Sequence, residues 1–502
     1  MRITKKQLFV AIAATLAAGL AAAGPDTTVL RNVTVVDTRS GALQPGRSVV
    51  IEQGRIARIV GARDAVAADA RIIDGGGKFL VPGYLDMHVH SVPAAFGPAP
   101  ALNLMLAHGI TGVRQMNGSP ELVRAARQFN AARAAGAAEV PEVLATAGAI
   151  LAGVRSPADG VAAVQATKAM GADFVKVVSA SPAALPAILA EAKQQALPVA
   201  GHLSPGLDAL ASAAGYRSIE HLGASPTPVQ FSCSAEADAI RADLLAGKGT
   251  APTAALTPTY VVSPFLYAAG DAPFVQQMMD SYDPARCDAV AEAVVARGAW
   301  QVPTLIRLHA MLQSDDASFR EDPALRYVDP SLRGLWSRLG GEFGAMQPAS
   351  ARTTFHAFYE SYVNMLRVLH RHGGAATTLT GSDTGGIWVV PGASLHREFA
   401  ELAAAGFTPL EVLQATTLNG ARFLHREATM GTVEVGRHAD LVLLDADPTA
   451  DARNLTKIAG VFNAGRYLSK AQLDAMKDGI AAQAAASPAR TLAELIDASH
   501  KD

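Results

Sequence analysis

Apolar runs of strand length alternate with alanine-rich segments through the middle of the chain. The intervening segments 121–135, 184–196 and 207–214 space their apolar residues at intervals compatible with a helix of 3.6 residues per turn. Strand followed by helix, repeated eight times, predicts a (β/α)8 TIM barrel of the α/β class. The predicted strands are Gly83–Val89, Ile110–Met116, Val143–Ala149, Asp173–Val178, Pro198–Leu203, Ser218–Leu222, Gln301–Ile306 and Thr378–Thr384.

Two connections between these strands are long. Segments 223–300 and 307–376 exceed what a loop and one crossover helix need. We expect both to contain extra helices that cover the mouth of the barrel and shape a substrate pocket. In such barrels the active site lies at the carboxyl ends of the strands, so candidate chemistry is sought there.

The two ends of the chain share a different pattern. Short β-rich runs separated by turn residues fill 27–80, and similar runs return after Gly431. This predicts one small β-sandwich domain built from both chain ends. The predicted organisation is a signal peptide (1–23), a composite β-sandwich domain (24–80 and 428–468), the barrel (81–427) and a C-terminal helical tail (469–502).

The first residues are typical of a secretory signal peptide. A basic start, with Arg2, Lys5 and Lys6, precedes an uncharged run from Leu8 to Ala23 that ends in small residues. The run is shorter than the roughly 20 residues that a membrane span needs, although an uncleaved anchor is the alternative. We therefore expect an exported protein of a bacterial periplasm or the cell exterior, with no stable membrane insertion.

Composition narrows the possible partners. Half of the chain is hydrophobic and 18% is charged, which is typical of a globular protein. The net charge of −2 argues against a nucleic-acid partner, which would require a basic excess. We expect a small-molecule substrate, and the sequence leaves open whether the protein is a monomer or a homo-oligomer.

Two cysteines exclude a cysteine-rich metal cluster and a fold built on disulfides. Cys233 and Cys287 both lie in the connection 223–300. In an exported protein they can form a disulfide, and two free thiols are the alternative.

Histidines end the first predicted strand. His88 and His90 are two residues apart, so on a strand they face the same side and can bind one divalent ion. Asp86 lies on the same face and is a candidate for orienting a metal ligand. A pair of ordinary polar histidines is the alternative.

Potential ligands also end other strands. Lys176 lies in an apolar strand, where a charged amine is costly unless its charge is used or removed. Snorkelling or pairing with a carboxylate is the alternative explanation. His202, His221 and Asp383 end three further runs, so five strands present such groups at one rim. Nitrogen and oxygen ligands of this kind suit zinc or a similar ion, and two ions about 3.5–4 Å apart are the expected arrangement.

Other polar residues near the rim are candidates for structural or substrate-binding roles. Glu220 alternates with His221 along its strand, so we expect it to face away and to be structural. Candidates for binding a substrate carboxylate are Arg114, Tyr260, Arg307 and His309, with packing or surface exposure as the alternative.

These motifs together resemble the amidohydrolase superfamily of metal-dependent hydrolases. The resemblance rests on Val81–His90, Lys176, His202, Glu220-His221, Gly381–Asp383 and the segment 431–448. Within that superfamily the chain is similar to the imidazolonepropionase-like branch and its metal-dependent dipeptidases, through 171–177, 303–305 and 396–402.

The resemblance implies a role for each ligand. His88, His90 and Asp383 would hold one ion, and His202 and His221 would hold the second. Lys176 would be N6-carboxylated and would bridge two divalent ions, expected to be zinc. Such ions generate hydroxide near neutral pH, and Asp383 would act as general base and then as general acid.

We therefore predict a hydrolase that cleaves amide bonds in dipeptides or N-acyl amino acids. One alternative keeps the metal centre but changes the substrate to a lactone, a carbamate or a phosphotriester. The other is a barrel that binds a small ligand without catalysis.

Overall fold

The protein is described from a computed structural model. The structure describes residues 27–203, 209–210, 214–223, 229–246, 248, 269–346, 348–491 and 494. The predicted signal peptide lies outside these residues. Of the predicted C-terminal tail, the structure describes residues 469–491 and 494.

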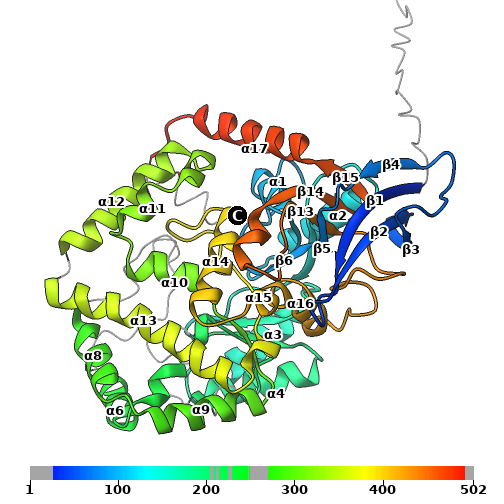
Figure 1. Ribbon diagram of the computed structural model, residues 1–502. Coiled ribbons are helices and arrows are strands. Elements are labelled where there is room, and N and C mark those ends of the chain that lie inside the picture. Colours follow the sequence, from blue (N-terminus) through cyan, green and yellow to red (C-terminus); the bar gives the residue numbers. More distant parts are fainter. Residues whose placement is uncertain are drawn as a thin grey trace, which may run out of the picture.

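The central part has a TIM-barrel-like α/β fold made of two parallel sheets (Figure 1). One sheet has the order β6-β7-β8 and the other the order β12-β11-β10-β9. The strands are β6 (Tyr84–Val89), β7 (Ile110–Gln115), β8 (Glu142–Thr146), β9 (Val175–Val177), β10 (Val199–Gly201), β11 (Ser218–Glu220) and β12 (Trp300–Val302). Every residue of β6 and β7 is buried, as expected for parallel strands covered on both faces.

Single parallel bridges link the two sheets. Ala147 pairs with Phe174 at one junction. The eighth predicted strand, 378–384, is represented by two bridges, Gln301 to Thr378 and Val89 to Thr384. Residues of all eight predicted strands therefore take part in parallel pairing, and the carboxyl ends of these segments share one rim.

The seventh prediction was wrong in its second half. β12 ends at Val302, and α10 (Leu305–Leu312) begins within the predicted strand. Thr304 causes the break, because its φ of 45° is in the left-handed region and cannot continue a strand.

Strands from both chain ends form one sheet. Its order is β15-β14-β13-β5-β1-β2-β3, and β4 pairs with β1. β13 pairs antiparallel with β5, which joins the C-terminal strands to the N-terminal ones. The strands are β1 (Thr27–Val36), β2 (Leu43–Glu52), β3 (Arg55–Gly61), β4 (Arg71–Asp74), β5 (Phe79–Pro82), β13 (Leu441–Leu444), β14 (Ile458–Asn463) and β15 (Arg466–Ser469).

Both long connections contain extra helices, as predicted, and α8, α12 and α13 lie on the side of the molecule away from β1–β4 (Figure 1). The first contains η2 (Val229–Cys233), α6 (Ala237–Leu245), η3 (Ala269–Asp271), α8 (Ala272–Asp280) and α9 (Pro284–Ala296). The second contains α10, α11 (Ala317–Arg320), η4 (Pro323–Tyr327), α12 (Pro330–Met346), α13 (Ala349–Arg371) and η5 (Gly374–Thr377).

Local sequence signals define many helix ends. Ser119 accepts a hydrogen bond from Leu122 N at the start of α2, and the next residue is a proline. Ser469 forms a capping box with Gln472 at the start of α17. The remaining helices are α1 (Pro100–Ala107), α2 (Pro120–Ala134), α3 (Pro157–Ala169), α4 (Ala184–Gln194), η1 (His221–Gly223), α14 (Ala393–Ala404), α15 (Pro409–Ala415), α16 (Leu418–Phe423), η6 (Ala452–Thr456) and α17 (Lys470–Ala485).

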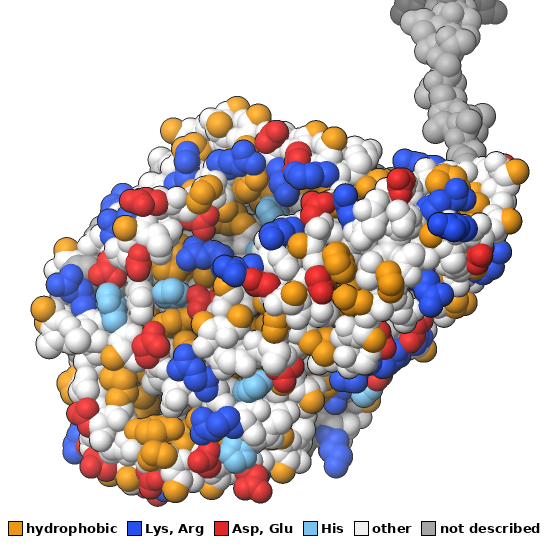
Figure 2. All heavy atoms as spheres, viewed as in Figure 1, with side chains coloured by type: hydrophobic (Ala, Val, Ile, Leu, Met, Phe, Trp, Pro, Cys, Tyr) orange, Lys and Arg blue, Asp and Glu red, His pale blue; other side chains and the backbone are white. Residues whose placement is uncertain are grey.

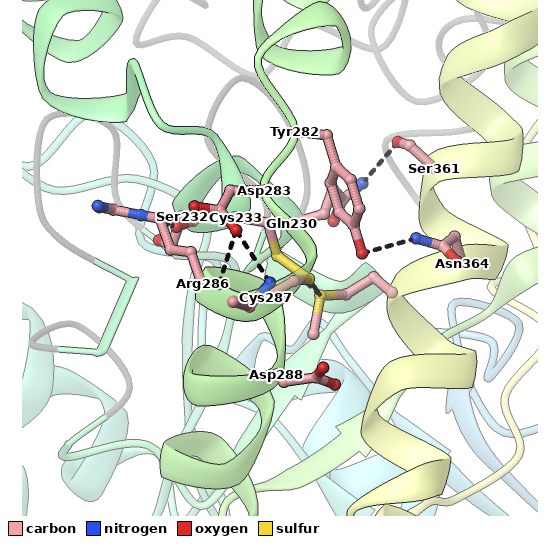
Figure 3. The surroundings of a disulfide bond; sticks show 12 residues. Gln230, Ser232, Cys233, Tyr282, Asp283, Arg286, Cys287, Asp288, Ser361 and Asn364 are labelled. Atoms are coloured by element: carbon pink, nitrogen blue, oxygen red, sulfur yellow. Dashed lines mark hydrogen bonds between the residues drawn. A yellow bond between two sulfur atoms is a disulfide. The ribbon is translucent and has the colours of Figure 1, made fainter.

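Cys233 and Cys287 form a disulfide that joins η2 to α9 (Figure 3). The sulfur of Met365, on α13, lies 3.7 Å from both cysteine sulfurs. Arg286 Nε also donates to Ser232 O, at 2.6 Å. The first connection is thus fixed covalently within itself and packed against the second connection.

Among the described residues, no helix is both long and apolar enough to cross a membrane. Figure 2 shows charges of both signs dispersed over the face in view. This distribution agrees with the nearly neutral composition.

Candidate metal centre

Three of the predicted ligands meet at the rim. The ligand atoms of His88, His90 and Asp383 lie within 4.8 Å of one another. The Nε2 atoms of both histidines are 3.3 Å from Asp383 Oδ1. His88 lies on β6 and His90 directly follows it, and the segment bridged to β6 supplies the aspartate, so parallel pairing explains why they meet.

The other two histidines lie next to this group. His221 Nε2 is 3.8 Å from Asp383 Oδ2, and its ring centroid is 4.6 Å from that of His88. His202 follows β10, and its ring centroid is 4.9 Å from that of His221. Burial lowers the pKa of both His202 and His221 well below the usual value, which keeps the imidazoles neutral as metal binding requires.

Lys176 is buried in the same part of the barrel. Its side chain is 2% exposed, and its Nζ has no hydrogen-bond partner in the described part of the chain. Burial lowers the pKa of Lys176 to about 8, and the charge of Lys176 in turn lowers the pKa of His88 and His202. The Lys176 amine interacts electrostatically with three imidazoles and two carboxylates, and an amine without a hydrogen-bond partner in such surroundings is unexplained by packing alone.

Left-handed backbone conformations direct several of these side chains. His221 has φ 55° and Asp383 has φ 54°, although neither is glycine. Such residues tend to occur at functional sites, where the surrounding structure holds them in place. Because the backbone of His221 leaves the strand conformation, its side chain does not obey the alternation along β11.

The prediction that Glu220 faces away was therefore wrong. Glu220 is fully buried, and its Oε2 accepts a hydrogen bond from His88 Nδ1 at 2.7 Å. Burial opposes its charge, but Arg114 and His88 lower the pKa of Glu220 well below the usual range. Glu220 thus lies next to the candidate ligands, although the strand pattern predicted that it lies on the opposite side.

Two further residues that the sequence analysis missed hold the other histidines. Asn117 Oδ1 lies 2.8 Å from His90 Nδ1 and also accepts from Gln115 Nε2. Thr304 Oγ1 lies 2.5 Å from His221 Nδ1 and donates its own proton to Pro303 O. The position of Asn117 directly after the predicted strand Ile110–Met116 could have suggested its role, whereas Thr304 lies inside the predicted strand Gln301–Ile306, where no signal marked it.

These partners define the protonation of the three rings. Glu220, Asn117 and Thr304 all act as acceptors, so the proton of each imidazole lies on Nδ1. Each Nε2 therefore presents a lone pair toward Asp383. This is the arrangement in which histidine binds a metal ion while its other nitrogen is held by a neighbour.

Asp86 lies as predicted beside a ligand. Its Oδ1 accepts from the backbone N of His88 at 3.3 Å and from Ser382 N at 3.0 Å. Ser382 Oγ donates to Oδ2 at 2.5 Å. Asp86 thus connects β6 to the segment that carries Asp383, and burial raises its pKa to about 7.

Arg114 does not occupy the position of a substrate-binding residue. It is 1% exposed, and its guanidinium donates to Met87 O, Ser218 Oγ and Glu220 Oε1 at 2.6, 3.0 and 2.7 Å. These contacts direct it into the barrel interior, so the predicted contact with a substrate carboxylate was wrong.

Of the other substrate-binding candidates, Arg307 lies at the candidate site and His309 does not. Arg307 Nε lies 3.4 Å from Asp383 Oδ2, at the centre of the candidate site. His309, on the same helix, contacts Glu401 through Nδ1 at 2.8 Å and stacks on Tyr359. It therefore packs against α13 and α14. Tyr260 lies outside the described residues.

A second cluster of potential ligands lies at another place in the fold. Glu142, His438 and Asp440 have ligand atoms within 4.8 Å of one another. However, Glu142 forms a two-point ion pair with Arg426, and Asp440 pairs with Arg133. This cluster is an ion-pair junction between the barrel and the composite sheet.

Comparison with known proteins gives a family match over the C-terminal part of the chain. Residues 359–468, which include Asp383, match the family model described as "Amidohydrolase family". An adenine deaminase of Ruegeria pomeroyi is 33% identical over 102 residues, which are 20% of this chain. The chain matches only 17% of that relative's length.

Solved structures agree over most of the chain. The bottromycin amidohydrolase superposes with a TM-score of 0.65 at 22% identity, covering 92% of this chain and 91% of that one. A Xaa-Pro dipeptidase with bound methionine superposes with a TM-score of 0.59 at 18% identity, covering 88% of this chain and 100% of that one.

Residues 359–468 thus carry an amidohydrolase family domain, and the structural neighbours of the whole chain are amidohydrolase- and prolidase-type proteins. The resemblance drawn from its motifs is confirmed, and so is the expectation of a TIM-barrel-like α/β fold. The amidohydrolase family generally uses divalent metal ions, and the donor set described above fits such ions.

Proposed function

We propose that this amidohydrolase is a binuclear metal-dependent enzyme that cleaves amide bonds of dipeptides or N-acyl amino acids. The observation that carries the proposal is the convergence of His88, His90 and His221, whose Nε2 atoms lie within 3.8 Å of Asp383. The names of the bottromycin amidohydrolase and the Xaa-Pro dipeptidase support a substrate with a carbon–nitrogen bond.

The chain offers ligands for two ions. His88, His90 and Asp383 would hold one, and His202 and His221 the other, with zinc as the ion that suits these donors. The buried Nζ of Lys176 supports N6-carboxylation, because only a neutral amine adds carbon dioxide and its pKa is lowered to about 8. When bound, the ions acidify water and polarise the substrate carbonyl.

Asp383 supplies the proton transfers. Its neighbours His88 and His221 lower its pKa well below the usual value despite burial, so the carboxylate is ionised and can accept a proton. It accepts one from the attacking water and returns it to the departing nitrogen, as general base and then acid. Arg307, 3.4 Å from Oδ2, adds a guanidinium that suits a substrate carboxylate.

The direct test uses purified, metal-loaded protein and a library of dipeptides and N-acyl amino acids. We expect release of amino acids by the wild type. Asp383→Asn should reduce turnover by about 10²–10⁴-fold or more, because a general acid–base group contributes that much. Asp451→Asn, at the exposed start of η6, is the control and should keep wild-type turnover.

Three results would contradict the proposal. Cleavage of lactones, carbamates or phosphotriesters without any amide would move the reaction to another bond on the same centre. No cleavage, with less than one metal ion per chain, would favour a barrel that only binds a small ligand. Full turnover by Asp383→Asn would overturn the assigned base.

We also propose the wider setting of the enzyme. A closed eight-stranded barrel and a composite β-sandwich domain, with the boundaries given above, would be its scaffold. The disulfide and the apolar segment 8–23 support export to the periplasm or the cell exterior, since disulfides persist in oxidising compartments.

A further inference from the structure

A buried guanidinium lies behind the histidines of the candidate site. Arg114, on β7, is among the largest fully buried side chains of the described residues. Its three hydrogen bonds reach the neighbouring strand β6, at Met87 O, and the more distant strand β11, at Ser218 and Glu220. One side chain therefore ties together the strand that carries His88 and the strand that ends directly before His221.

The carboxylate of Glu220 is held on both of its oxygens. Oε1 accepts from Arg114 Nη2 at 2.7 Å and from Ser218 Oγ at 2.6 Å. Oε2 is left for His88 Nδ1, at 2.7 Å. Because Arg114 and Ser218 fix one oxygen, the direction of the other is fixed as well.

The guanidinium itself has little freedom. Its carbon lies 5.4 Å from the ring centroid of Phe174 and 5.0 Å from that of Phe423. Two aromatic rings near a desolvated guanidinium favour its charge and limit its movement. Arg114 is therefore a rigid support, unlike a solvated surface arginine.

We propose that Arg114 and Glu220 are positioning residues that act as one unit to fix His88 for metal binding. Arg114 holds the backbone directly before His88 through Met87 O, and Glu220 holds the ring through Nδ1. Together they direct the lone pair of Nε2 to the point that His90 and Asp383 also face. The inference rests on the proposed metal site and adds residues that do not themselves touch the metal.

The two charges should be strongly coupled. Removing only Arg114 leaves a buried carboxylate without its cation, which is costly. When both charges are removed, the neutral amide that replaces the Glu220 carboxylate can still accept a hydrogen bond from His88 Nδ1. A double-mutant cycle isolates this coupling, because independent residues would show additive effects.

The experiment compares Arg114→Met, Glu220→Gln and the double variant with the wild type. Zn²⁺ affinity is measured by competition with a chromophoric chelator, and ¹⁵N NMR of the metal-free protein reports which nitrogen of His88 carries the proton. We expect Arg114→Met to weaken Zn²⁺ binding by about 10–100-fold, as loss of an outer partner commonly does. The double variant should bind more tightly than Arg114→Met alone.

Two variants separate positioning from general loss of stability. Arg133→Met removes another buried arginine, which donates to Asn463 and pairs with Asp440 at the junction with the composite sheet. It should lower stability but leave Zn²⁺ affinity unchanged. Arg114→Lys should fold if Arg114→Met does not, and it should show intermediate affinity because an ammonium cannot reproduce the three directed bonds.

The outcomes distinguish this inference from the proposed function. If the wild type binds Zn²⁺ and the Arg114 variants bind it equally well, or if the effects are additive, the positioning pair is wrong while the metal centre stands. If the wild type binds no Zn²⁺, the proposed function fails. In that case the NMR measurement still tests the positioning pair by itself. If the proton on Nδ1 of His88 does not depend on Arg114, the positioning pair is wrong.

Discussion

At the scale of single residues, the amine of Lys176 is the group whose chemistry the fold leaves incomplete. It is buried on β9 without a hydrogen-bond partner among the described residues. Carboxylation would convert it to an anionic oxygen ligand, which removes the cost of a buried cation. The modification can be detected without measuring catalysis.

Protein equilibrated with ¹³C-bicarbonate should show a carbamate resonance that Lys176→Arg lacks. Arginine keeps a positive charge but does not form the carbamate, so the variant should also contain less metal than the wild type. Lys168→Arg is the control, because that lysine lies on α3 and donates to Gln195 O. A carbamate signal of equal size in Lys176→Arg would exclude this lysine as the modified group.

Residue patterns predicted which candidate ligands come together, but not which side chains surround them. Alternation along a strand placed His88 and His90 on one face, and parallel pairing brought Asp383 to them. The same rule failed at Glu220, because the φ of 55° at His221 is not visible in the sequence. Arg114 was misassigned for a similar reason: its three acceptors come from β6 and β11, which only the fold brings together.

At the scale of elements, the inserted helices depend on links that connect them to one another. Figure 3 shows Gln230 and Tyr282 of the first connection reaching Ser361 and Asn364 of α13, at 3.4 and 3.2 Å. The disulfide joins η2 and α9 across 54 residues of sequence. It should therefore restrict the unfolded chain as well as the insertion.

Replacing both cysteines by serine should lower the free energy of unfolding by about 4 kcal/mol, the loop-closure value for a loop of this length. Denaturant unfolding of the oxidised wild type and of the double variant measures the difference. Ser234→Ala, in the same connection, is a control that leaves the disulfide intact. An unchanged midpoint in the double variant would mean that the bond does not constrain the unfolded state.

The sequence predicted that the long connections contain helices, but not where α10 begins. Periodicity extended the seventh strand through Ile306, whereas the chain turns at Thr304. Thr304 is held there by His221 and Pro303. A contact with another strand therefore overrode the local apolar pattern.

At the scale of the whole molecule, three distant helices meet near a pair of histidines. His108 follows α1, His396 lies on α14, and His396 Nε2 contacts His108 O at 2.8 Å. Burial lowers the pKa of His396 to about 4 and that of His108 well below its usual value, and Lys477 on α17 lowers both further. These histidines are neutral in the folded protein at mildly acid pH.

Stability should therefore fall as the pH falls from about 6.5 toward 4. The pKa of each histidine is lower in the folded protein than in the unfolded chain, so the unfolded chain binds more protons in this window. Each histidine therefore lowers the free energy of unfolding by up to about 1.4 kcal/mol for each pH unit. Thermal unfolding of His396→Gln should show a weaker pH dependence than the wild type over the same range. His356→Gln, at a more exposed site on α13, is the matched control. Equal slopes for His396→Gln and the wild type would contradict this account.

The sequence by itself determined the order of the elements, the pairing of both chain ends and the residue types at the rim. These follow from local apolar periodicity and from the rule that parallel strands end at one edge. Tertiary structure decided what surrounds the ligands: Glu220 beside His88, Thr304 beside His221, and Arg114 inside the barrel. Those contacts join strands far apart in sequence and depend on single backbone angles, so no local pattern encodes them.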